Sequence, residues 1–89
     1  MKQLEQIDKM IQSGLIDNAI EVLHSFISEK PDDQAYYLLG NAYRKKGDFK
    51  NAMENYLEAI AINPDSPAVE AHQMLINILE FYHKDLYNP

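Results

Sequence analysis

The chain has 89 residues, contains no cysteine and carries a net charge of −6. This length supports one small domain with a thin core, and the lack of cysteine excludes disulfides and thiolate metal sites. The acidic balance disfavours nucleic-acid binding, and no apolar run reaches the roughly 18 residues of a membrane span, so we expect a cytoplasmic protein.

Residues 2–30 are predicted to form a first pair of helices. The apolar residues of the first helix recur three and four apart, at Leu4, Ile7, Met10 and Ile11. Gly14 is expected to end that helix, and Asp17 is a plausible N-cap for the second. The second helix should stop before Pro31, because the residue ahead of a proline disfavours the helical conformation.

Residues 33–66 carry the strongest pattern in the chain. Apolar and small residues recur three and four apart up to Gly47, and the same spacing resumes from Phe49. Gly47 suits the left-handed position that ends one helix, and Asp48 can cap the next. Pro64 stops that helix, because proline lacks the N–H that a further turn needs. We therefore expect an antiparallel helical hairpin.

Small residues near the turn indicate how these two helices pack. Gly40 and Ala52 lie on the inward faces, where a large side chain would push the helices apart. Tyr36, Tyr43 and Tyr56 are expected to fill the space to either side. A glycine within a helix costs about 1 kcal/mol relative to alanine, so Gly40 indicates a close backbone approach.

The same stretch resembles a tetratricopeptide repeat (TPR), a unit of about 34 residues. The family's signature positions are occupied here by Tyr36, Leu39, Gly40, Tyr43, Ala52, Tyr56, Ala59 and Pro64. Gly14, Ala19 and Pro31 each lie 33 residues before a signature or turn residue, so residues 1–32 are predicted to be a degenerate copy. The resemblance, to small bacterial TPR proteins in particular, implies an all-α fold of antiparallel helical hairpins in a right-handed superhelix.

Residues 67–89 are predicted to be a capping helix and a tail. Ser66 and Pro67 make a good N-cap and first helical position, and we expect the helix to run to about His83. Residues 85–89 either fold back on the body or fray. The whole chain is thus expected to be one domain of about five helices, with a well-formed repeat over residues 33–66.

The resemblance also implies where a partner binds. In TPR proteins the first helices of successive hairpins line a concave groove that receives an extended peptide or a partner helix. The family's groove positions correspond here to Gln34, Tyr37, Asn41, Arg44 and Lys45. By this resemblance the Asn41 amide holds a ligand's main chain, although asparagine at this position can also be structural. Arg44 and Lys45 could engage a carboxylate.

The neighbouring helices are expected to give this groove apolar walls. The comparable places hold Leu4, Asp8 and Ile11 in the first helix and Ala68, Ala71, His72 and Leu75 in the last. The basic residues with which some TPR domains hold a C-terminal carboxylate are missing, so the groove suits an amphipathic helix better than a charged tail. The leading hypothesis is a protein-binding adaptor, in which Asn41→Ala weakens partner capture and leaves the fold intact.

The last predicted helix offers an alternative function. Its apolar surface is wider than a cap needs, since a cap normally shows a polar outer face. Either the helix turns back over the groove, or it presents the surplus to another molecule. The alternative is a homodimer formed through Val69, Ile76 and Phe81, because two-fold self-association commonly buries such a surface.

No catalytic, cofactor or metal site is predicted. The histidines His24, His72 and His83 are spread over two predicted helices, and no pair has the i, i+4 spacing of a helical metal site. No glycine-rich phosphate loop or activated nucleophile appears either. We therefore expect a protein that is not an enzyme and that needs no cofactor.

Overall fold

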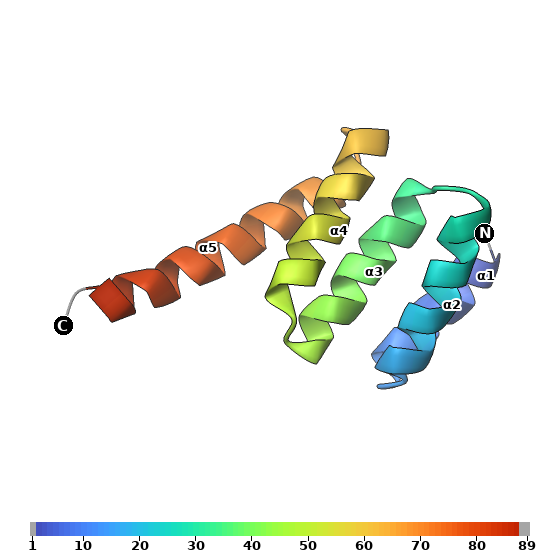
Figure 1. The fold of residues 1–89 in the computed structure, drawn as a ribbon, viewed down its shortest axis with the longest axis horizontal. Coiled ribbons are helices and arrows are strands. Elements are labelled where there is room, and N and C mark those ends of the chain that lie inside the picture. The colour runs from blue at the N-terminus through green and yellow to red at the C-terminus, as the bar shows by residue number, and fades with distance from the viewer. Residues whose placement is uncertain (1, 88–89) are drawn as a thin grey trace.

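The computed structural model describes the backbone of residues 2–87 and the side chains of residues 2–81. Within the described backbone it contains five α-helices and no β-strand. In chain order the helices are α1 (Lys2–Gln12), α2 (Ile16–Glu29), α3 (Asp33–Lys46), α4 (Phe49–Ile62) and α5 (Ala68–Tyr87). Figure 1 shows two neighbouring antiparallel pairs, α1 with α2 and α3 with α4, and α5 beside α4. The predicted all-α fold of two hairpins and a last helix is confirmed.

The turn between α3 and α4 has the predicted geometry. Gly47 has φ +88° and donates its N–H to Arg44, and the N–H of Asp48 bonds the carbonyl oxygen of Tyr43. The Asp48 carboxylate then accepts hydrogen bonds from the side chain and the backbone of Asn51, at 2.6 and 3.2 Å. These bonds hold the pKa of Asp48 below its ordinary value. The left-handed glycine and the capping aspartate together reverse the chain.

Two helix boundaries differ from the prediction. Asp17 is not the N-cap of α2, because the helix begins at Ile16 and the capping position is held by Leu15 without a side-chain bond. The Asp17 carboxylate instead accepts a hydrogen bond from Lys46 Nζ of α3, at 2.6 Å. The predicted end of α5 near His83 is also wrong, since the helix continues to Tyr87. The predicted tail therefore begins as helix, and its last two residues lie outside the described part.

Ser66 caps α5 as predicted. Its hydroxyl oxygen accepts a hydrogen bond from the N–H of Ala68, at 3.1 Å, and its carbonyl oxygen accepts one from Val69. From this start α5 passes α4 and then runs away from the other helices (Figure 1). The helix therefore does not fold back over α3, which was one of the two expectations for its apolar surface.

The core forms two clusters. The first joins α1, α2 and α3 and consists of Leu4, Ile7, Ile11, Ala19, Leu23, Ala35, Leu38, Leu39 and Ala42. The second joins α4 and α5 and consists of Ala52, Tyr56, Ala59, Ala68 and Leu75. Tyr36, Tyr37 and Tyr43 of α3 pack against both clusters. Because these tyrosines belong to one helix, α3 is the central helix of a thin molecule measuring 48 × 28 × 17 Å.

Gly40 marks the closest packing between α3 and α4. A Cβ atom placed there would lie against Cδ1 and Cε1 of the Tyr56 ring, and 2.9 Å from its Cζ. The expected lack of room at Gly40 is therefore observed. The group that approaches the α3 backbone is the aromatic ring, and not the backbone of α4.

Candidate partner-binding surfaces

The five predicted groove residues lie on one side of α3. Their spacings of three, four, three and one residues keep them on one face of a helix with 3.6 residues per turn. Gln34 and Lys45 are exposed at the two ends of this face, and Tyr37, Asn41 and Arg44 are half-buried between them. The structure thus brings all five together on a single helical surface.

Tyr56 of α4 supports the middle of this surface from below. Its side chain is fully buried, and its hydroxyl donates a hydrogen bond of 2.6 Å to the side-chain carbonyl oxygen of Asn41. Its ring also lies beside Tyr37, with a centroid separation of 6.1 Å and a tilt of 38°. Sequence reasoning gave Tyr56 only a packing role. Gly40, next to Asn41 in sequence and beneath the same ring, was the available signal for this contact.

The Tyr56 hydroxyl is a permanent donor at physiological pH. Burial raises its pKa to about 12, against a smaller opposing effect from the positive charge of Arg44. A protonated phenol that donates to Asn41 fixes which end of the amide faces the protein, because only the carbonyl end accepts. The NH₂ group of Asn41 is therefore the end available to a ligand.

The alkaline stability of the protein should report on Tyr56. Its pKa of about 12 in the folded state lies above the ordinary value of 10.0, so the resulting stabilisation holds below pH 10.0 and is lost as pH rises toward 12. Urea unfolding of wild type and Tyr56→Phe at about pH 8 and about pH 12 measures this. We expect wild type to lose on the order of 1–3 kcal/mol more than the variant. Equal losses would contradict this assignment of the raised pKa.

The predicted walls of the groove are wrong at four positions. Leu4 and Ile11 of α1 and Ala68 and Leu75 of α5 are all at most 4% exposed and belong to the two core clusters. They therefore hold the helices together and cannot contact a ligand in the groove.

The packing register of α5 explains the error for that helix. Buried Ala68 and Leu75 lie 33 residues after buried Ala35 and Ala42 of α3, whereas the prediction used a spacing of 34. With the observed register, α5 packs on α4 as α3 packs on α2. The same register puts Met74 of α5, 33 residues after Asn41, on the groove side of the molecule.

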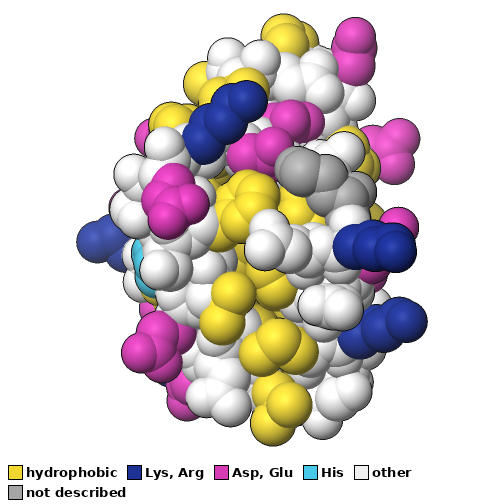
Figure 2. All heavy atoms as spheres, turned by 90° about the vertical axis from the view of Figure 1, so that its right-hand side faces the viewer, with side chains coloured by type: hydrophobic (Ala, Val, Ile, Leu, Met, Phe, Trp, Pro, Cys, Tyr) yellow, Lys and Arg dark blue, Asp and Glu magenta, His cyan; other side chains and the backbone are white. Residues whose placement is uncertain are grey.

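A second hollow surface lies between α1 and α2. Figure 2 shows a band of hydrophobic side chains on this end of the molecule, between polar and charged ones. The groove has a volume of about 500 Å³ and is lined by Gln3, Gln6, Ile7, Met10, Val22, Ser25, Phe26, Glu29, Lys30 and Asp32. Sequence reasoning missed it. The signal was present in the degenerate repeat, where Gln3 and Gln6 replace the aromatic residue and leucine of the family pattern.

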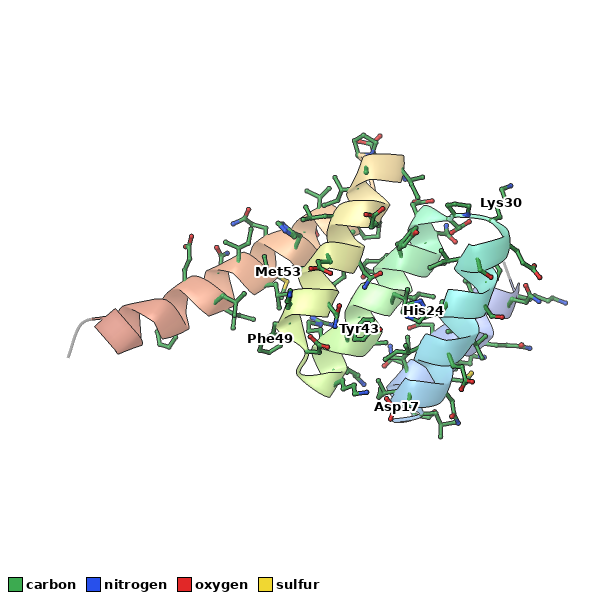
Figure 3. All side chains as sticks on the ribbon, viewed as in Figure 1. Asp17, His24, Lys30, Tyr43, Phe49 and Met53 are labelled. Atoms are coloured by element: carbon green, nitrogen blue, oxygen red, sulfur yellow. The ribbon has the colours of Figure 1, made fainter. Side chains whose placement is uncertain are left out.

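Polar contacts join the two hairpins on the other side of α2. His24 Nε2 and the Tyr43 hydroxyl are 3.2 Å apart, and Figure 3 shows the two side chains between α2 and α3. The nearby bond between Lys46 and Asp17 raises the pKa of Lys46. Among the described residues, no three side chains of metal-binding type gather into a possible site. His72 Nε2 is buried without a hydrogen-bond partner in the same part of the chain.

The three residues predicted for a dimer face do not form one patch. Val69 and Ile76 are seven residues apart and share one side of α5, where Val69 is exposed and Ile76 half-buried. Phe81 is turned away from them by roughly 120° about the helix axis. It lies instead on the side of Met74 and Ile78, and all three of these side chains are exposed.

Comparisons with known proteins agree with this architecture. The family model of the tetratricopeptide repeat matches residues 34–66. Cellulose synthase operon protein C of Escherichia coli is 32% identical over 73 residues, which are 81% of this chain, and the chain spans 6% of that protein's length. The solution NMR structure of Bacteroides fragilis protein BF1650 superposes with a TM-score of 0.88 at 51% identity, covering 99% of this chain and 91% of that one. In the described part of the chain, no helix has the length and apolarity to cross a membrane.

Proposed function

We propose that this chain, which belongs to the tetratricopeptide repeat family, is an adaptor that binds a protein or peptide through the α3 surface. Repeats of this family are generally protein-interaction modules and non-catalytic scaffolds. We further propose a cytoplasmic location and no enzymatic activity, consistent with the lack of any catalytic grouping in the sequence.

We also propose a division of the single domain. Residues 1–32 would be a degenerate repeat, residues 33–66 a well-formed repeat, and residues 67–89 a cap with its tail. The 33-residue register between α3 and α5 supports this division, because α5 then takes the place of the first helix of a third repeat. A terminal helix of this kind covers the open face of the preceding hairpin.

The observation that carries the proposed binding site is the hydrogen bond from Tyr56 to Asn41. It orients a half-buried amide on the exposed side of α3, with its NH₂ group available to accept-bearing groups such as a main-chain carbonyl. Tyr37 beside it offers an aromatic face, and Arg44 offers a cation. A bound segment would then have an apolar side, an accessible carbonyl and an acidic residue, which suits an amphipathic helix.

The structure changes the best variant for testing this site. Asn41→Ala was expected to leave the fold intact, but it removes the acceptor of a buried hydroxyl, which costs about 1–3 kcal/mol. Asn41→Asp keeps an acceptor for Tyr56 and removes only the NH₂ donor. We expect Asn41→Asp to reduce partner capture about tenfold, which corresponds to one lost hydrogen bond of about 1.4 kcal/mol.

The measurement is affinity capture from the native cell followed by quantitative mass spectrometry. Asn18→Asp is the matched control, because Asn18 is exposed on α2 and the substitution makes the same change in charge. The control should capture the same proteins as wild type in the same amounts. Undiminished capture by Asn41→Asp would remove α3 as the binding surface and favour the groove between α1 and α2.

A further inference from the structure

The side of α5 that faces away from α4 carries a regular apolar stripe. It consists of Ala71, Met74, Ile78 and Phe81, called the α5 stripe below. Met74 is 55% exposed, Ile78 40% and Phe81 62%, and Ala71 is half-buried where the helix still contacts α4. This stripe is a large part of the exposed apolar surface of the molecule.

The spacing of the α5 stripe is that of a coiled-coil seam. Its members are separated by three, four and three residues, the alternation by which one helix packs along another. The buried pair Ala68 and Leu75 borders the stripe on one side, so a helix placed there would also contact the edge of the core. The stripe is therefore shaped for a second helix that runs beside α5.

We propose that α5 of a second copy of this chain packs antiparallel along the α5 stripe. A two-fold axis near Ile76 pairs the stripe with itself. Ala71 then faces Phe81 of the partner subunit, and Met74 faces Ile78 of the partner subunit. In each layer a smaller side chain meets a larger one, which fills space without a gap.

Charge along the edge of the stripe selects the same arrangement. Glu70, Asn77 and Lys84 follow one another at intervals of seven residues beside the stripe. In the antiparallel pair, Glu70 faces Lys84 of the partner subunit, and the two copies of Asn77 face each other. A parallel pair would set Glu70 against Glu70 and Lys84 against Lys84, which is unfavourable.

A second copy fits these observations better than an unrelated helix does. The apolar layers and the charges are both symmetric about nearly the same point of α5, as an isologous two-fold interface requires. Four layers make a short seam, so the dimer is weak and its population depends on protein concentration. The interface uses Met74 and Ile78 and leaves Val69 outside, in contrast to the dimer face expected from the sequence.

Sedimentation equilibrium of the full chain, from about 10 μM to about 1 mM, tests the proposal. We expect wild type to dimerise, and Ile78→Glu to raise the dissociation constant at least about tenfold, because it places a carboxylate in two layers of the seam. Val69→Glu is the matched control. Val69 and Ile78 are similarly exposed, at 42% and 40%, but lie on different sides of α5, so the control should dimerise like wild type.

A charge exchange tests the antiparallel register without disturbing the apolar layers. Glu70→Lys alone should weaken the dimer about tenfold, since both symmetric pairs become repulsive. Adding Lys84→Glu should return the dissociation constant to within about threefold of wild type. Wild type that stays monomeric throughout, a Val69→Glu effect as large as that of Ile78→Glu, or a double variant no tighter than Glu70→Lys would each overturn the proposal.

Discussion

Gly40→Leu is expected to abolish cooperative folding. The new side chain would enter the space of the Tyr56 ring, which is fully buried and hydrogen-bonded to Asn41 and so has little room to move. Overpacking of this kind costs about 1–3 kcal/mol for a methylene or two, and a whole leucine side chain costs more. The total stability of a small domain is only about 5–15 kcal/mol, so the hairpin should not survive.

Thermal unfolding followed by circular dichroism measures this effect. Gly40→Ala should give an intermediate result, because a gain of about 1 kcal/mol in helix propensity opposes the clash of its Cβ with Tyr56. Combining Gly40→Leu with Tyr56→Ala checks the cause, since removing the ring should make the leucine less harmful. A Gly40→Leu protein that melts like wild type would refute the packing argument.

Leu75→Glu is expected to detach α5 while the first four helices stay folded. Leu75 is 1% exposed and packs with Tyr56 and Ala59 in the second core cluster. An unpaired carboxylate buried there costs several kcal/mol, more than the contacts of one terminal helix are expected to repay. The energetically cheaper response is for α5 to leave α4, because α5 packs at the end of the row and α3 remains covered by α2 and α4.

Amide hydrogen exchange separates detachment from global unfolding. Protection should fall throughout α5 in Leu75→Glu and persist in α3 and α4. Ile78→Glu is the control, because Ile78 lies three residues further along the helix and is 40% exposed. If both variants kept α5 protected, the docking of α5 through Leu75 would be wrong.

The hairpin architecture was predictable because its determinants are local. Gly47 and Asp48 specify the turn by their own backbone and side-chain chemistry, and helical periodicity reveals the two faces on each side of it. Ser66 likewise caps α5 with a bond to a residue two positions away. Features of this kind need no knowledge of distant parts of the chain.

The errors and omissions depend on contacts between distant residues. Asp17 lies 29 residues from Lys46, and only the folded hairpins show that its carboxylate is used there and not as a cap. The bond between Tyr56 and Asn41 spans 15 residues and two helices in the same way. The groove positions of α5 were displaced by one residue because the loop before it fixes the register, and helical periodicity alone does not reveal that shift.

The molecule is 17 Å across its thinnest direction, and its helices follow one another in a row. Each helix is consequently held mainly by its immediate neighbours, and the helix at the end of the row has support from one side. A polypeptide bound across α3 and α5 would act as a splint for that end. Occupancy would then show itself first as a stiffening of the outermost rod, well before any rearrangement of the two hairpins.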